Sequence, residues 1–149
     1  MILSPSVQEA IRTHAEEEYP LECCGILIGL PGPEARVTTA RRAHNRNEEG
    51  ARDRFDLDPR DYLQAEEEVA DTPEEILGFY HSHPDHPAWP SPTDLIRAQP
   101  WGGYFHLIVA VHADGFRKDL RVWQVTEDEE GFVEETLQVE AVAKGNLHP

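Results

Sequence analysis

Three short apolar runs do most to limit what this chain can fold into. They read ECCGILIGL, EEILGFYHSH and YFHLIVAVHA, and they cover residues 22–30, 74–83 and 104–113. Runs of this length, bounded by turn residues such as Pro and Gly, are typical of buried strands. Segments with helical spacing lie before and between them. This alternation predicts an α/β or mixed α+β domain built in layers.

Helices are predicted over residues 4–18, 58–71 and 91–99. Ser4 and Asp58 can cap the first two, and each cap is followed by a proline suited to the first helical turn. One face of the first helix is expected to hold four residues: Val7, Ala10, Ile11 and His14. Further strands are predicted at 35–45, paired with the first apolar run, and at 118–126. Residues 46–58 are expected to be irregular, and 132–140 to form a final strand or short helix.

Length and composition favour one soluble globular domain over residues 1–149. Hydrophobic residues make up 39% of the chain, and no stretch approaches the roughly 18 apolar residues that a membrane span needs. The N-terminus has neither the basic start nor the long apolar run of a secretory signal. The two cysteines, Cys23 and Cys24, are adjacent, which suits free thiols in a reducing compartment. We therefore expect a cytoplasmic location and no membrane partner.

The charge is strongly negative. The chain carries 13 basic and 29 acidic residues, for a formal net charge of −16. Such a field repels phosphate backbones, so no nucleic-acid partner is expected. The acidic residues are spread over several short runs, among them 16–18, 66–68 and 127–130. Scattered runs of this kind predict solvated faces.

The sequence HSHPDHPAWPSPTD, residues 81–94, carries the candidate chemistry. Residues i and i+2 of a strand point to one face, so His81 and His83 present both imidazoles to the same side. Asp94 follows at the start of the next helix, and the Pro-rich loop can bring its carboxylate back as a third ligand. Three protein ligands leave the fourth position of zinc open for water, which is typical of a catalytic site. This predicts one zinc ion per chain.

Each half of the motif also has a simpler interpretation on its own. A pair of histidines two apart in a strand is more often a packing feature than a metal site. The sequence SPTD is a good helix start, with Ser91 as the cap, Pro92 in the first turn and Asp94 as the capping-box acid. The two halves joined by a short Pro-rich loop are much more specific for a metal site than either alone.

The complete pattern resembles the signature of the JAMM (MPN+) metalloisopeptidase family, which reads H-S-H-P, six residues, then S-x-x-D. The family also places a glutamate on an early strand, in a setting like YPLECCGILIG, which matches Glu22. The resemblance covers residues 22–29, 54–59 and 81–94. Within the family, the sequence most resembles stand-alone bacterial members that release cysteine from the C-terminus of a sulfur-carrier protein.

The resemblance implies a fold and a set of roles. The fold is a curved mixed β-sheet with helices on both sides, similar to that of cytidine deaminases. His81, His83 and Asp94 would bind zinc, Glu22 would act as general base and then return the proton to the leaving amine, and Ser91 would hydrogen-bond the developing oxyanion. Amide hydrolysis needs these three functions: a nucleophile, an acid for the amine and stabilisation of the oxyanion.

The activity implied is hydrolysis of an amide bond after the Gly-Gly tail of a ubiquitin-like or sulfur-carrier protein. Two alternatives stay open. The first is a non-catalytic scaffold of the MPN type, although such domains lose zinc ligands that this chain keeps. The second is the JAB domain associated with DNA repair, against which the charge of −16 argues.

The remaining candidates have structural interpretations. Trp89 either lines a substrate groove or folds over the core. The other predictions are a solvated His86, packing or surface positions for His106 and His112, buried positions for Cys23 and Cys24, and core positions for Trp101 and Trp123.

Overall fold

The computed structural model describes residues 1–46 and 57–141. Most of the stretch 46–58, expected to be irregular, lies outside the described residues, and so do residues 54–56 of the segment 54–59 to which the family resemblance extends. No helix in the described part of the chain is long and apolar enough to cross a membrane.

The elements alternate along the chain much as the apolar runs indicate. Their order is β1 (Ile2–Leu3), α1 (Pro5–Glu18), β2 (Cys24–Leu30), β3 (Arg36–Ala43), α2 (Pro59–Val69), β4 (Glu75–Pro84), α3 (Pro92–Ala98), the 3-10 turn η1 (Gln99–Trp101), β5 (Phe105–His112), β6 (Gly115–Val125), β7 (Phe132–Glu135) and β8 (Gln138–Val139). The three predicted helices and the three apolar strands are confirmed. The segment 132–140 forms two short strands rather than one element.

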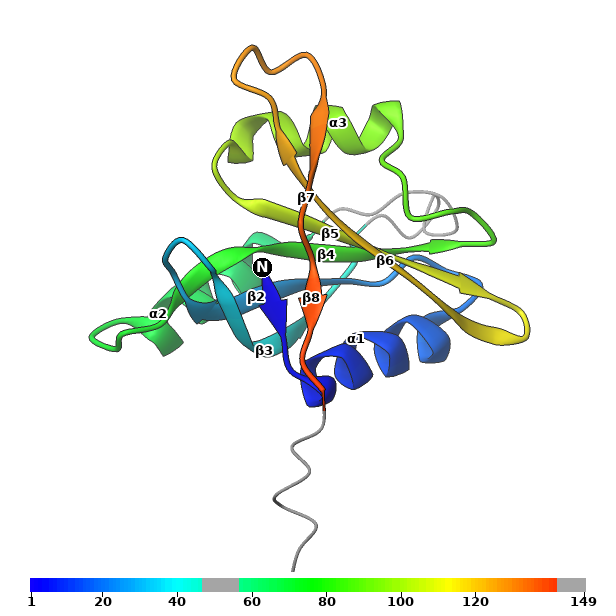
Figure 1. The fold of residues 1–149 in the computed structure, drawn as a ribbon, viewed down its shortest axis with the longest axis horizontal. Coiled ribbons are helices and arrows are strands. Elements are labelled where there is room, and N and C mark those ends of the chain that lie inside the picture. Colours follow the sequence, from blue (N-terminus) through cyan, green and yellow to red (C-terminus); the bar gives the residue numbers. More distant parts are fainter. Residues whose placement is uncertain (47–56, 142–149) are drawn as a thin grey trace, which may run out of the picture.

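Within the described residues, the strands form one mixed sheet in the order β7-β6-β5-β4-β2-β3-β1-β8. β4 is parallel to β5 and antiparallel to β2, and β1 is parallel to both β3 and β8. β7 and β8 stand at opposite ends of this order, although only residues 136 and 137 separate them along the chain. The three Cα–Cα steps from Glu135 to Gln138 span at most about 11 Å, so the sheet curls until its ends meet (Figure 1). The predicted curved mixed sheet is confirmed.

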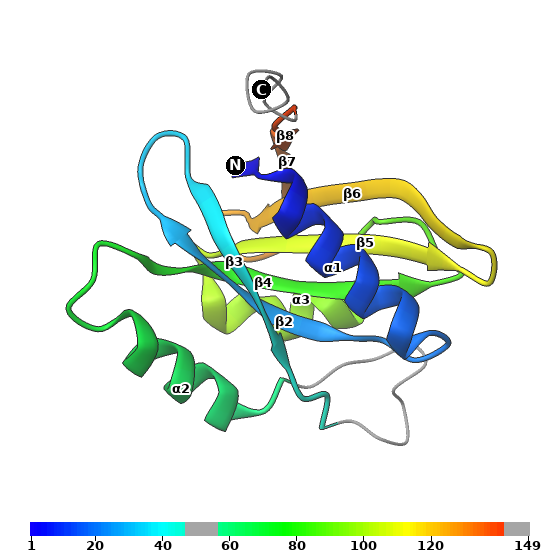
Figure 2. The same ribbon diagram turned by 90° about the horizontal axis from the view of Figure 1, so that it is seen from below.

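Helices cover both faces of the sheet. α1 lies on the opposite side of the central strands from α3 in both ribbon views (Figures 1 and 2). Side chains alternate along β4, so Tyr80 joins the cluster under α1, whereas Phe79 joins Ala65 of α2 on the other face. The histidines at 81 and 83 share the face of Phe79. The candidate site therefore lies on the side of α2 and α3.

The first helix follows its predicted cap but not every predicted contact. The Ser4 hydroxyl accepts a hydrogen bond from the Val7 N–H at 3.2 Å, as a capping residue should. Three of the four predicted face residues are buried, but Ala10 is exposed and Ala15 is buried in its place. The reason is helical geometry, because Ala15 lies four residues after Ile11 and so points to the same side.

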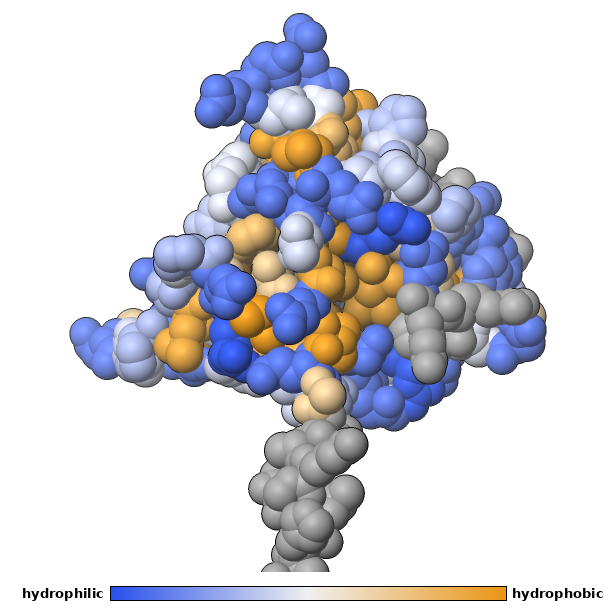
Figure 3. Space-filling view, viewed as in Figure 1, coloured by the Kyte–Doolittle hydropathy of each residue, from blue (hydrophilic) through white to orange (hydrophobic). Residues whose placement is uncertain are grey.

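Acidic runs cover the outside as predicted. Residues 66–68 on α2 and 127–130 in the turn after β6 are exposed, and so are two of the three glutamates at 16–18. Figure 3 shows hydrophilic residues over most of the visible face, with an apolar area near the middle around β8. The charge of −16 is thus spread over solvated surface instead of being collected in one tail.

A buried polar pair joins α1 to the strand that carries the candidate site. The Nδ1 atom of His14 lies 2.7 Å from the Tyr80 hydroxyl, and both side chains are buried. Gly25 on β2 makes room for this tyrosine, because a Cβ there would collide with the Tyr80 ring. Burial lowers the pKa of His14 to about 4, with a smaller contribution from the charge of Arg42. His14 is therefore neutral in the folded protein near pH 7.

We predict that His14 makes folding pH-dependent in mild acid. An unfolded histidine titrates near 6.5, so between about pH 6.5 and 4 the unfolded chain binds a proton that the folded chain excludes. The free energy of unfolding should be fully retained above pH 6.5 and fall as the pH drops through this window. His14→Gln should show a shallower fall, measured by urea unfolding at several pH values. Parallel curves for the two proteins would contradict a buried neutral His14.

Candidate metal centre

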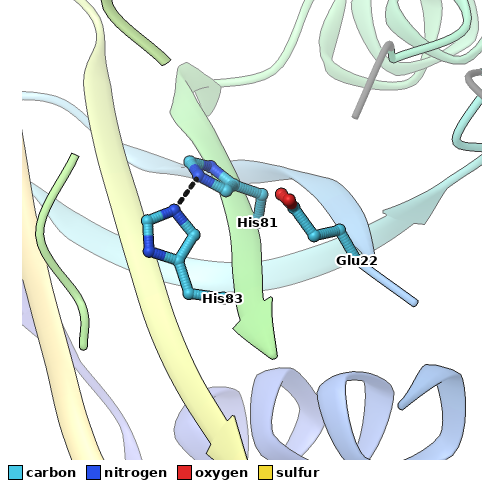
Figure 4. A group of neighbouring side chains, drawn as sticks. All are labelled: Glu22, His81 and His83. Atoms are coloured by element: carbon cyan, nitrogen blue, oxygen red, sulfur yellow. Dashed lines mark hydrogen bonds between the residues drawn. The ribbon is translucent and has the colours of Figure 1, made fainter. Parts of the chain in front are cut away.

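Two histidines at the end of β4 form the centre of the site. His81 and His83 are both buried, and their Nε2 atoms lie 3.2 Å apart (Figure 4). β4 is held on both sides here, because Cys24 of β2 pairs with His81 and Ala110 of β5 pairs with His83. A strand paired on both edges is rigid, so the two imidazoles are presented in a defined geometry. The same-face arrangement predicted from the spacing is confirmed.

Asp94 reaches the two histidines from the first turn of α3. Ser91 caps this helix, with its Oγ accepting from the Asp94 N–H at 3.1 Å and its own N–H donating to Asp94 Oδ2 at 2.9 Å. Asp94 Oδ1 lies 3.2 Å from His81 Nε2, and Oδ2 lies 3.0 Å from His83 Nε2. The predicted capping box and the predicted approach of Asp94 to the histidines both occur. The hydrogen bonds of the capping box hold the Asp94 carboxylate in the position from which it reaches the histidines.

The three side chains fit a zinc ion by their spacing. Zinc bonds of roughly 2.0–2.1 Å in a tetrahedron separate neighbouring ligand atoms by about 3.3 Å, close to the 3.0–3.2 Å between these atoms. The Nδ1 atom of His83 lies 2.8 Å from the Pro87 carbonyl, which can only accept, so Nδ1 carries the hydrogen. The Nε2 lone pair of His83 is then directed at Asp94 and His81. A metal cation bound between these atoms would accept this lone pair.

Electrostatics prepare two of these groups, His81 and Asp94, for a metal. Burial lowers the pKa of His81, although the charge of Asp94 partly opposes the shift. Burial alone raises the pKa of Asp94, but His81 and the Ser91 N–H lower it below its ordinary value. Near pH 7 the site thus offers a neutral imidazole at His81 and an ionised carboxylate at Asp94, the states that bind metal.

Glu22 completes the polar group. It stands just before β2 and is buried, and its carboxylate and the two histidine ligand atoms all lie within 4.8 Å of one another. Figure 4 shows the carboxylate directed toward His81. The Asn45 side chain donates to the Glu22 carbonyl at 3.2 Å, which ties this point of the chain to the end of β3. A glutamate at a strand start is usually solvated, so its burial beside His81 and His83 is the unusual feature.

Ser82, between the two histidines, holds the neighbouring strand in place. Its Oγ accepts from the Cys23 N–H at 2.8 Å, and its N–H donates to the Cys23 carbonyl at 3.1 Å. Cys23 and Cys24 are both buried, as predicted, but only Cys24 belongs to β2, and Cys23 lies just before it. Burial raises the pKa of Cys23 to about 12. Cys23 therefore stays a thiol near pH 7 and is a poor nucleophile or metal ligand.

Of the positions predicted for the other candidate residues, some are confirmed and one is wrong. His86 is exposed and Trp123 is buried, as predicted. Trp89 folds over Trp123, with ring centroids 4.9 Å apart, yet remains 52% exposed. The core position predicted for Trp101 is wrong. This side chain is partly exposed because η1 places it at the border of a cavity.

An apolar cavity of about 450 Å³ adjoins His81 and Asp94. Its lining comes from α2, α3, η1 and three strands, and includes Leu57, Tyr62, Phe79, Ile96, Trp101, His106 and Phe132. Sequence reasoning missed most of these residues because they are far apart along the chain. Phe79 carried a signal, since it lies two residues before His81 and shares its face. His106 packs against Phe79, and burial lowers the pKa of His106 to about 4.

Comparison with known proteins agrees with this arrangement. Residues 4–126 match the model of the family described as prokaryotic homologs of the JAB domain. The chain belongs to this family. Among solved structures, this prokaryotic JAB protein is similar to a JAB1/MPN domain protein from Archaeoglobus fulgidus, with a TM-score of 0.58 and 18% identity over 94% of this chain and 97% of the other. This likeness supports the JAB/MPN fold.

Two curated relatives are peptidases by name. The desampylase of Haloferax volcanii is 34% identical over 110 residues, which cover 71% of this chain and 77% of the relative. The CysO-cysteine peptidase of Mycobacterium tuberculosis is 28% identical over 128 residues, 85% of this chain and 84% of the relative. Together with the family match, they identify this JAB protein as a hydrolase of the peptidase class.

Ser82→Ala tests how the strand ends are held together. The change removes the acceptor of the buried Cys23 N–H, and an unsatisfied buried donor costs about 1–3 kcal/mol. The free energy of unfolding should fall by that amount, measured by urea unfolding at pH 7. Ser6→Ala, which alters an exposed serine, is the control and should have little effect. A Ser82→Ala protein as stable as the wild type would show that the bond to Cys23 contributes nothing.

Proposed function

We propose that this chain is a zinc-dependent isopeptidase that cleaves the amide bond after the C-terminal Gly-Gly tail of a ubiquitin-like or sulfur-carrier protein. The observation that carries the proposal is the buried triangle of His81, His83 and Asp94 with Glu22 beside it. The names of the relatives, a desampylase and a CysO-cysteine peptidase, support this class of substrate.

In this proposal His81, His83 and Asp94 hold the metal. Bound zinc would polarise the scissile carbonyl and lower the pKa of water toward about 7. Glu22 lies close enough to the histidines to take the proton of the attacking water and then give it to the leaving amine. A buried carboxylate that moves one proton in both directions is an effective acid–base group.

Ser91 suits the role of oxyanion donor. Its Oγ uses a lone pair to accept the Asp94 N–H. The hydroxyl hydrogen is then left for the oxygen that gains charge during the reaction. Capping α3 and stabilising the oxyanion are therefore compatible tasks for a single side chain.

The apolar cavity gives the substrate tail a place on the acyl side of the bond. It borders His81 and Asp94, whereas Glu22, which would meet the leaving amine, is not part of its lining. Leu57 belongs to the lining and forms an isolated antiparallel β-bridge with Asn45. The side chain of Asn45 in turn donates a hydrogen bond to the Glu22 carbonyl. An extended tail beside Leu57 would need small residues next to the metal, because only glycine lets its backbone approach closely.

The alternatives have less support. A non-catalytic scaffold does not require two histidines, Asp94 and Glu22 to be buried together. A DNA-repair role is opposed by the net charge of −16. The proposal takes residues 1–149 as one domain. It also places the protein in the cytoplasm, which suits two buried free cysteines.

The metal assignment predicts one zinc per chain. Purified wild-type protein given zinc and then dialysed should retain about one ion, whereas His83→Ala, with one of three ligands removed, should retain far less. His86→Ala is a matched control, since it removes an exposed histidine three residues further on. Metal analysis of the three proteins decides the matter. Equal zinc content in wild type and His83→Ala would overturn the assignment.

The catalytic assignment predicts that Glu22→Gln abolishes hydrolysis while zinc content and fold are kept. Loss of a general acid–base group should lower kcat by about 10²–10⁴-fold. The substrates are carrier proteins with a Gly-Gly tail joined to cysteine or to a lysine side chain, and the products are read by mass. Glu18→Gln, at an exposed glutamate, should retain activity. Near-normal turnover by Glu22→Gln would exclude Glu22 as the base.

A further inference from the structure

One peptide group in the loop between His83 and Asp94 connects His83 to β6. The carbonyl of Pro87 lies 2.8 Å from His83 Nδ1 and accepts its hydrogen. The N–H of Ala88 donates to Asp119 Oδ2 at 3.0 Å. These two groups belong to the same peptide bond, and a trans peptide directs its C=O and N–H in opposite directions. A hydrogen-bonded path therefore runs from Asp119 on β6 through this peptide to His83.

Neighbouring contacts keep that peptide in place. The indole N–H of Trp123 donates to the Ala88 carbonyl at 3.1 Å, and Ala88 is completely buried. Arg121 Nε donates to the other oxygen of Asp119 at 3.1 Å and lies over the ring of Trp89, 5.0 Å from its centre. Both hydrogen-bonding groups of Ala88 are thus occupied by side chains of β6. This arrangement leaves the peptide little freedom to rotate.

We propose that Asp119 is a positioning residue for the metal centre, acting through the Pro87–Ala88 peptide on His83. This inference rests on the proposed metal-binding role of His83. A carboxylate that accepts the Ala88 N–H polarises the peptide and strengthens the Pro87 carbonyl as an acceptor. The stronger acceptor holds the hydrogen of His83 on Nδ1 and keeps the Nε2 lone pair directed at the metal.

The test is the zinc affinity of the folded protein, measured by competition with a chromophoric chelator. Loss of a group that orients a metal-bound histidine typically weakens metal binding by about 10–100-fold, and we expect such a loss for Asp119→Ala. Asp119→Asn keeps an oxygen that can accept the Ala88 N–H, so it should recover much of the affinity. Glu134→Ala is the matched control. It removes another carboxylate partner of Arg121, and Glu134 makes no hydrogen bond to Ala88 among those the structure describes.

The outcomes separate the two proposals. If the wild-type chain binds no zinc, the proposed function fails, and with it the role of Asp119. If the wild type binds zinc and Asp119→Ala binds it within threefold as tightly, only the role of Asp119 is overturned. An equal loss in Glu134→Ala would also overturn it, because the effect would then be general surface charge. If Asp119→Ala does not fold, Trp123→Phe provides a second variant, because it removes the hydrogen bond to the Ala88 carbonyl. Zinc binding by Trp123→Phe as tight as that of the wild type would count against the role of the Pro87–Ala88 peptide.

Discussion

The antiparallel pairing of β2 with β4 is the constraint on which the rest of the site depends. It brings the start of one strand beside the end of the other, so Glu22 comes next to His81 and His83 although about sixty residues separate them. The doubled hydrogen bonds between Ser82 and Cys23 hold the strands at this point. The parallel neighbour β5 supports the other edge of β4. Without this register, the glutamate would have no relation to the histidines.

The site also concentrates polar groups in a place that would otherwise be apolar. Glu22, His81, His83 and Asp94 are all buried, and the adjoining cavity is lined mainly by aliphatic and aromatic side chains. Burial of unpaired charge is costly, so these groups are stable only with close partners. The same low-dielectric surroundings strengthen any charge interaction made there. The polar groups therefore need one another to be stable when buried, and their burial strengthens the interactions among them.

Local rules account for much of the fold and for the core of the site. Strand periodicity places His81 and His83 on one face, and the capping box at Ser91 brings Asp94 to them. What local rules missed depends on distant contacts. β1 and β8 are two residues each, too short to show any period, and they form only because other strands offer them an edge. Asp119 on β6 and the cavity residues of α2, η1, β5 and β7 come from elements with no motif of their own.

The curled sheet has a consequence for how the chain acquires its structure. β8 pairs with β1, and the N-terminal amine of Met1 donates to the carbonyl of Thr136, a separation of 135 residues. Contacts of this range have a large loop-closure entropy and form slowly compared with local contacts. During synthesis, β1 and α1 emerge first but cannot complete their edge of the sheet until residues 132–140 have been made. The curl therefore makes closure of the sheet a late step in folding.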